Sequence, residues 1–268
     1  MNSLKDKKAL VTGGGSGIGK AIARELAAQG AKVLIHYFKS KESAESLAAE
    51  IRASGGMADI IQADLSSEEG VEALASFVEK KWTNLDVLVN NSGDLVARHK
   101  LEEMDMDFYR RVMAVNLDSN ILVTRAMIPL LRKSGASSIV NLASLAGRKG
   151  GHAGSIIYAT TKGAILTLTR SLSTELAPDG IRVNAVAPGL ILGSAFHAIH
   201  TTQAVKDATI ASIRFCSARS VATRQKESAR PLSRSRLAER DIGTSVPSPA
   251  TNTSCRRSFS SASFSSND

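Results

Sequence analysis

Six short apolar runs, separated by longer amphipathic stretches, constrain the fold of this chain more than any other feature of its sequence. They span residues 8–13, 32–38, 57–63, 85–91, 137–143 and 181–187. Each is rich in Val, Ile or Leu, as expected for strands that are buried on both faces. Helical periodicity covers residues 17–29, 41–54, 67–81, 103–133 and 155–177. The alternation predicts an α/β fold with a doubly wound parallel sheet and helices on both of its faces.

A glycine-rich turn, "TGGGSGIGK", directly follows the first of these strands and opens the first helix. Gly13, Gly17 and Gly19 let the backbone approach a pyrophosphate, and the amides at the start of the next helix point toward the anion. Taken alone, such a turn is also compatible with a flexible connection. Its place between a strand and a helix favours a dinucleotide site.

The stretch "YATTK" places Tyr158 four residues before Lys162, near the start of the last predicted helix. This spacing puts both side chains on one face of a helix. For an arbitrary helix, a packed Tyr beside a solvated Lys is the commoner arrangement. A paired phenol and ammonium is the functional alternative.

Charge and cysteine content exclude several kinds of protein and site. Of the net charge of +9, residues 1–213 supply +3 (24 basic and 21 acidic residues) and residues 214–268 supply +6, which argues against nucleic-acid binding by the main body. The two cysteines, Cys216 and Cys255, cannot form a disulfide scaffold or a multi-cysteine metal site. The five histidines form no metal-binding pattern, so we expect no metal.

The apolar runs are shorter than the roughly 18 residues of a membrane span, and the start "MNSLKDKKALVTG" has no signal-peptide core. We therefore expect a cytoplasmic protein without a membrane partner. After Ile213 the sequence changes to 14 Ser and 9 Arg among 55 residues, without a helical or strand period. This composition predicts one domain over residues 1–213 and a disordered or frameshifted tail over 214–268.

Further motifs follow the predicted strands in order: "ADL" at 63–65, "NNSG" at 90–93, "VMAVNL" with Asn116, "NLASLAG" with Ser144, "YATTK", and "VAPG" at 186–189. Together with the glycine-rich turn, they resemble the short-chain dehydrogenase/reductase family over residues 7 to about 200, and within it the 3-oxoacyl-carrier-protein reductase branch. The resemblance implies a Rossmann-like fold and a homo-oligomer. Family members normally end in a further helix and strand, which nothing after Ile213 resembles. We therefore expect the C-terminal strand to be missing and the sixth strand to be an uncovered edge.

The resemblance implies catalytic roles for Asn116, Ser144, Tyr158 and Lys162. In the family, the tyrosine protonates a carbonyl oxygen as hydride arrives, or acts as the base in the reverse oxidation. The serine hydrogen-bonds the substrate oxygen, the asparagine supports a water-mediated proton relay, and the lysine holds the nicotinamide ribose. A free phenol titrates at about 10, so we expect the Lys162 ammonium to lower the pKa of Tyr158.

The implied cofactor contacts come from the turn, the ends of the strands and the last predicted helix. They are Gly13, Gly15, Ser16, Gly17, Ile18, Gly19, Tyr37, Lys39, Ser40, Asp64, Leu65, Asn91, Gly93, Tyr158, Lys162, Pro188, Gly189 and Ile191.

The end of the second strand bears on the choice of cofactor. An Asp there would hydrogen-bond the ribose 2′-hydroxyl of NAD and repel a 2′-phosphate. The stretch "HYFKSKE" instead offers Tyr37, followed by Lys39, Ser40 and Lys41. This favours NADP over NAD, although two lysines at a helix start are also compatible with simple solvation.

The sequence therefore predicts an oxidoreductase that transfers a hydride between NADP(H) and a small-molecule carbonyl or secondary alcohol, and the resemblance implies a substrate of 3-oxoacyl type. One alternative is a nucleotide-binding protein whose catalysis is impaired by its aberrant C-terminal segment. A second is a nucleic-acid binder that acts through the Arg- and Ser-rich tail; the balanced charge of residues 1–213 argues against it, and we expect no specific nucleic-acid partner.

Overall fold

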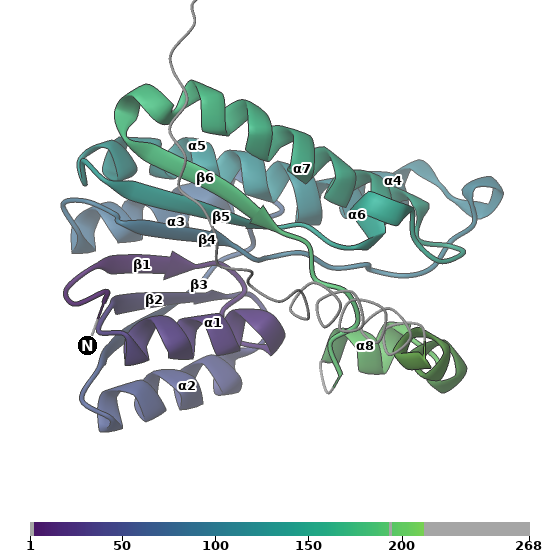
Figure 1. Cartoon of the computed structure of the whole chain (residues 1–268), viewed down its shortest axis with the longest axis horizontal. Coiled ribbons are helices and arrows are strands. Elements are labelled where there is room, and N and C mark those ends of the chain that lie inside the picture. The colour runs from purple at the N-terminus through teal and green to yellow at the C-terminus, as the bar shows by residue number, and fades with distance from the viewer. Residues whose placement is uncertain (1–2, 193–194, 212–268) are drawn as a thin grey trace, which may run out of the picture. The chain divides into compact units, whose positions relative to one another are not determined.

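Six parallel strands form one sheet in the order β3-β2-β1-β4-β5-β6 (Figure 1). The computed structural model describes residues 3–192 and 195–211, all within the first of two units, residues 1–217. The strands are β1 (Lys8–Val11), β2 (Lys32–Tyr37), β3 (Met57–Gln62), β4 (Val87–Asn90), β5 (Ser137–Leu142) and β6 (Ile181–Val186). All six predicted strands are confirmed, each ending one or two residues before its predicted end. From β1, the strands β2 and β3 are added on one side and the strands β4, β5 and β6 on the other. Doubly wound folds bind their ligands at this point, between β1 and β4.

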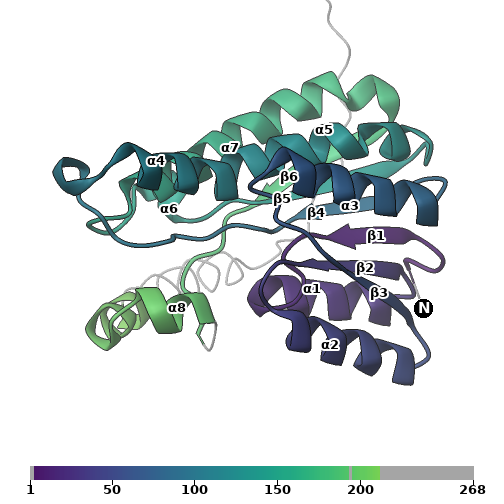
Figure 2. The ribbon, with the colours of Figure 1, turned by 180° about the vertical axis from the view of Figure 1, so that it is seen from behind.

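Helices cover both faces of the sheet (Figures 1 and 2). They are α1 (Gly17–Ala28), α2 (Lys41–Ala53), α3 (Glu68–Lys81), α4 (Met106–Met113), α5 (Ser119–Arg132), α6 (Ala146–Lys149), α7 (Ile156–Glu175) and α8 (Ala195–His200), with short 3₁₀ turns at Leu101–Glu103 and Ala177–Asp179. Leu47 of α2 and Ile35 of β2 belong to one core cluster, together with residues of α1. Met127 of α5 and Leu10 of β1 belong to a second cluster, which includes residues of α3 and α7. Alternate side chains of the central strands thus enter opposite cores, which confirms the predicted α/β fold.

The long helix predicted over residues 103–133 is wrong in detail. The α-helix begins only after Asp105, whose carboxylate caps it by accepting a hydrogen bond from the Phe108 backbone N–H at 2.7 Å. Between α4 and α5 the chain makes a π-helical turn, Ala114–Asp118, which contains Asn116. Helical periodicity in a sequence does not reveal such a widened turn, and π turns are frequent at functional sites. The short helices α6 and α8 and the helical residues 203–211 were not predicted.

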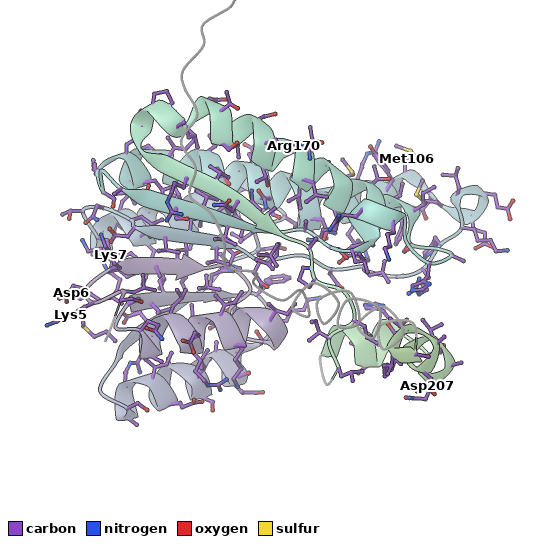
Figure 3. The ribbon with its side chains drawn as sticks, in the orientation of Figure 1. Lys5, Asp6, Lys7, Met106, Arg170 and Asp207 are labelled. Atoms are coloured by element: carbon purple, nitrogen blue, oxygen red, sulfur yellow. The ribbon has the colours of Figure 1, made fainter. Side chains whose placement is uncertain are left out.

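A buried carboxylate ties the amino ends of the strands together. Asp86 accepts hydrogen bonds from the Lys8 backbone N–H at 2.8 Å, from Lys7 Nζ at 3.1 Å and from Ser134 Oγ at 2.7 Å. Burial raises the pKa of Asp86, but these hydrogen bonds outweigh burial, so the net shift is downward. Lys7 lies on the amino side of the sheet, as Figure 3 shows. The carboxyl ends on the opposite side remain for the functional site.

In the described part of the chain, β6 pairs only with β5 and ends the sheet. Val186 at the end of β6 is 51% exposed. The predicted tail after residue 213 lies outside the described residues, so the predicted domain boundary stays a prediction. Among the described helices, none combines the length and the apolar character that crossing a membrane requires.

Candidate active site

The first glycine of the glycine-rich turn is held from two neighbouring strands. Gly13, with φ at 61°, donates its N–H to Nδ1 of His36 at 3.1 Å. Its carbonyl accepts a hydrogen bond from Asn91 Nδ2 at 3.1 Å. A Cβ at Gly19 would come closer than 3.0 Å to the same carbonyl and to Asn91 Nδ2, so helix α1 packs directly on the turn. At Gly17, by contrast, no atom lies within 4 Å of where a Cβ would be. The turn therefore leaves open space at the start of α1, where backbone amides can face an anion.

The end of β2 supports this turn. A Cβ at Gly15 would meet Ser40 and would lie 3.2 Å from the Cβ of Tyr37. Tyr37 is only 5% exposed and belongs to the core, so it packs under the turn. Lys39 is exposed, with its Nζ 5.5 Å from the ring centroid of Phe38, which is exposed as well. Lys39 and Ser40 thus stay available for a cofactor, whereas Tyr37 acts mainly through packing.

Four other predicted cofactor residues flank the turn. Ser16 is the exposed N-cap residue of α1, and Ile18 is half-buried in its first turn. After β3, the Asp64 carboxylate accepts hydrogen bonds from Ser66, at 3.0 Å from the backbone nitrogen and 2.6 Å from Oγ. Leu65 is buried in the core. These residues follow the ends of β1 and β3 and therefore line the same edge of the sheet.

The segment after β6 closes the other side of this edge. The Pro188 carbonyl accepts a hydrogen bond from the Leu145 N–H at 2.8 Å, which joins this segment to the residue after Ser144. A Cβ at Gly189 would lie 3.5 Å from the Leu145 side chain. Ile191 is partly exposed. The predicted residues after β5 and β6 are therefore brought together by the fold.

Asn116 lies at the centre of a set of buried hydrogen bonds near this edge of the sheet. It is 0% exposed. Its Nδ2 donates to the carbonyls of Asp94 at 2.7 Å and Val112 at 3.0 Å, and its Oδ1 accepts from the Asp94 N–H at 3.2 Å. A Cβ at Gly93 would lie 2.7 Å from Asn116 Oδ1 and 2.9 Å from Lys162 Nζ. Because Gly93 has no side chain, the amide of Asn116 and the ammonium of Lys162 can converge.

Tyr158 and Ser144, two of the predicted catalytic residues, interact with each other at this edge of the sheet. The Tyr158 hydroxyl is hydrogen-bonded to Ser144. Burial raises the pKa of Tyr158; the bond to Ser144 opposes this rise, and the negative charge of Asp94 adds to it. The net direction is upward, so the predicted lowering of the pKa by Lys162 is wrong for this structure. The physical reason is position, because Lys162 Nζ lies over the Tyr158 ring, 5.7 Å from its centroid, while the hydroxyl is directed to Ser144.

Lys162 is buried to 4% exposure on α7, one turn after Tyr158. Its Nζ donates to the Leu142 carbonyl at the end of β5, at 2.9 Å. Burial lowers the pKa of Lys162 to about 8. The predicted pairing of a tyrosine and a lysine on one helix face is therefore present, with the lysine fixed by the backbone of the sheet.

A buried polar network that the sequence did not predict lies behind these residues. Asn90 Nδ2 donates to Thr124 Oγ1 and to Asn141 Oδ1, both at 2.9 Å, and Asn141 Nδ2 donates to Thr169 Oγ1 at 3.0 Å. The network joins β4, α5, β5 and α7, which carry or adjoin the catalytic candidates. The available signal was an Asn near the end of each of two strand runs, directly beside their apolar residues.

A second missed group links α8 to the loops beside the site. The Arg98 guanidinium donates to the His200 carbonyl at 3.2 and 2.9 Å and to the Ala153 carbonyl at 2.9 Å. Nε2 of His200 lies 3.4 Å from the Asp94 carboxylate. Within the described ranges, no three His, Cys, Asp or Glu side chains are placed to hold a metal ion.

Comparison with known proteins shows which family the chain belongs to. A family model described as short chain dehydrogenase matches residues 7–204. The chain belongs to the short-chain dehydrogenase family. It is 39% identical over 195 residues to a 3-oxoacyl-[acyl-carrier-protein] reductase of Synechocystis, covering 71% of this chain and 76% of that protein. It is also 39% identical over 190 residues to the corresponding reductase of Staphylococcus aureus, covering 69% and 75%.

Two solved structures show which cofactors similar proteins bind. An NADH-dependent reductase, A1-R′, complexed with NAD is 35% identical, with a TM-score of 0.68 and coverage of 71% of this chain and 81% of that one. A short chain dehydrogenase of Burkholderia cenocepacia in complex with NADP is 38% identical, with a TM-score of 0.65 and coverage of 69% and 75%. The protein is therefore an oxidoreductase of a family that uses nicotinamide dinucleotides.

Proposed function

We propose that the protein transfers a hydride between NADP(H) and a carbonyl or secondary alcohol of 3-oxoacyl type. The observation that carries the proposal is the half-buried Tyr158, whose hydroxyl is hydrogen-bonded to Ser144 at the carboxyl edge of the sheet, with Lys162 one helical turn away. A phenol, a hydroxyl and an ammonium so arranged can polarise a carbonyl oxygen and supply a proton to it.

The nicotinamide ring, when bound, supplies or accepts the hydride. The residues of the chain orient the substrate, supply the proton and hold the cofactor. Ser144 orients the substrate oxygen, and Tyr158 donates a proton to it during reduction. Because burial raises the pKa of Tyr158, its hydroxyl is protonated at neutral pH, which suits the direction of reduction. Lys162 would hold the ribose beside this hydroxyl, and Asn116 fixes the loop after β4 through both sides of its amide.

NADP preference is supported by Lys39 and Ser40 beside the turn and by the absence of an acidic residue at the end of β2. Tyr37 is a poor place to test this preference, because a carboxylate at this buried position would destabilise the fold. Exposed Phe38 is the better position. The unmodified protein should bind NADPH more tightly than NADH, and Phe38→Asp combined with Lys39→Gln should reverse the order. Lys133→Gln is the control, because Lys133 is exposed at the end of α5, before the amino end of β5.

A turnover screen with NADPH should include 3-oxoacyl thioesters and simple ketones. Oxidation of NADPH by a 3-oxoacyl thioester supports the proposal, and oxidation by unrelated ketones alone contradicts the substrate class. Tight NADPH binding without turnover on any substrate would select the alternative, a nucleotide-binding protein with impaired catalysis. The exposed end of β6 is the observation that favours this alternative.

A further inference from the structure

We propose that His36 is a positioning residue for the dinucleotide, and that its neutral imidazole sets the glycine-rich turn for cofactor binding. The inference rests on the proposed function only in that the ligand is a nicotinamide dinucleotide. His36 is the fifth residue of β2 and is 2% exposed, although the other residues of the strand after Lys32 are apolar or aromatic. A buried imidazole at this place requires partners for both of its nitrogens.

Both nitrogens have partners that fix the state of the ring. Nδ1 accepts the Gly13 N–H at 3.1 Å, and Nε2 lies 3.0 Å from the Ala63 carbonyl. A carbonyl only accepts, so Nε2 must carry a proton, and a backbone N–H only donates, so Nδ1 must be unprotonated. The ring is therefore the neutral form with its proton on Nε2.

One ring thus joins two parts of the nucleotide site, the glycine-rich turn and the segment after β3. The Gly13 peptide is clamped between His36 on its N–H side and Asn91 on its carbonyl side, in a left-handed conformation. The Gly14 N–H also donates to the His36 carbonyl at 2.8 Å. Ala63 directly precedes Asp64 at the end of β3. His36 therefore sets the glycine-rich turn relative to the segment after β3.

Protonation of the ring would break this arrangement, because a proton on Nδ1 would point at the Gly13 N–H. Burial lowers the pKa of His36, while the Ala63 carbonyl and the carboxylate of Asp64 act in the opposite direction. Above its pKa the ring holds the turn, and acid releases it. Cofactor affinity should therefore fall on acidification, because His36 of the protein is protonated and not because a group of the cofactor is.

Fluorescence titration of NADH and NADPH between pH 5.5 and 8.5 tests this without any turnover. Both nucleotides are needed, since the 2′-phosphate of NADPH itself titrates at about pH 6, and only a loss common to both belongs to the protein. His36→Phe keeps a ring of similar shape and removes both hydrogen bonds, so both nucleotides should bind roughly tenfold more weakly at pH 8. His36→Asn keeps an acceptor near the place of Nδ1 and cannot titrate. Its affinity at pH 8 should stay near that of the unmodified protein, and the loss on acidification should disappear.

His152→Asn, in the exposed loop before α7, is the matched control and should leave both affinities and their pH dependence unchanged. Equal affinities of His36→Phe and the unmodified protein would overturn the inference. So would an acid-dependent loss that persists in His36→Asn, which decides the question even if His36→Phe does not fold. If the unmodified protein binds neither nucleotide at any pH, the proposed function itself fails, and that result is distinct from the other two.

Discussion

Replacing Gly19 by Ala tests how tightly the glycine-rich turn and helix α1 are packed. Gly19 is buried in the first turn of α1. An added Cβ would lie 2.9 Å from the Gly13 carbonyl carbon, and nearer still to the Gly13 oxygen and Asn91 Nδ2. Real Cβ atoms essentially never come within 3.0 Å of such atoms. Because one of the neighbours is backbone, the turn itself must move.

The expected change in the free energy of unfolding is the sum of opposing contributions. Helix propensity favours Ala over Gly by about 1 kcal/mol. Overpacking of this kind costs typically about 1–3 kcal/mol, and displacement of Asn91 Nδ2 weakens its bonds to the carbonyls of Thr12 at 2.9 Å and Gly13 at 3.1 Å, each worth about 1 kcal/mol. The net expectation is a loss of roughly 1–3 kcal/mol in the free energy of unfolding, with a clear loss of NADPH affinity.

Urea denaturation measures the loss as a lower midpoint with an unchanged m-value. Gly17 supplies the control, since no atom surrounds its missing Cβ and only its φ of 51° disfavours a side chain. Gly17→Ala should lower the free energy of unfolding by about 1–2 kcal/mol through backbone conformation alone. Gly17→Asn should lower it less, because Asn tolerates the left-handed region. At position 19, Asn should lower the free energy of unfolding more than Ala does, because its larger side chain is more crowded there. A Gly19→Ala protein that is more stable than the unmodified one, as helix propensity alone would give, refutes the packing argument.

Three further predictions concern charge. The folded state lowers the pKa of Lys162 from 10.5 to about 8, so the unfolded chain binds more protons than the folded one between these two pH values. The unfolding free energy of the unmodified protein should therefore rise with pH across that window, relative to Lys162→Met, by up to roughly 3 kcal/mol. Equal pH slopes of the two proteins in urea titrations would contradict this. Asp86, with its lowered pKa, stabilises the fold above its unfolded pKa, so Asp86→Asn should lose about 1–3 kcal/mol at pH 7, a deficit that thermal melts should show shrinking as the pH falls through the folded pKa. Deleting residues 214–268 should abolish any weak nucleic-acid binding, which filter binding should show to fall steeply with salt in the full chain; binding retained after the deletion would be the opposite result.

The six strands were predictable because the strand signal is local. Each apolar run carries enough Val, Ile and Leu to indicate a buried strand without knowledge of its neighbours. The motifs at the strand ends then fall at one edge because parallel strands share one direction. Tyr158 and Lys162 were predictable for the same reason, since a four-residue spacing fixes their shared helix face.

What the sequence did not reveal depends on contacts between distant residues. The direction of the Tyr158 pKa shift depends on where the ammonium of Lys162 sits relative to the hydroxyl, and the Leu142 carbonyl, 20 residues away, helps to decide this. The role of His36 could not be predicted, because its partners lie 23 and 27 residues away in the chain. The late start of α4 after Asp105 and the π turn at Asn116 were not predicted, because neither interrupts the apolar period of the segment.

Single-turnover oxidation of NADPH, followed at 340 nm with a carbonyl substrate accepted in the screen, tests most directly whether Tyr158 is the acid of the reaction. The unmodified protein is compared with Tyr158→Phe and with Tyr109→Phe, a matched tyrosine of α4. Tyr158→Phe should slow the chemical step by roughly 10² to 10⁴ with NADPH affinity nearly unchanged, and Tyr109→Phe should do neither. A Tyr158→Phe protein that oxidises NADPH at the unmodified rate would contradict the central claim.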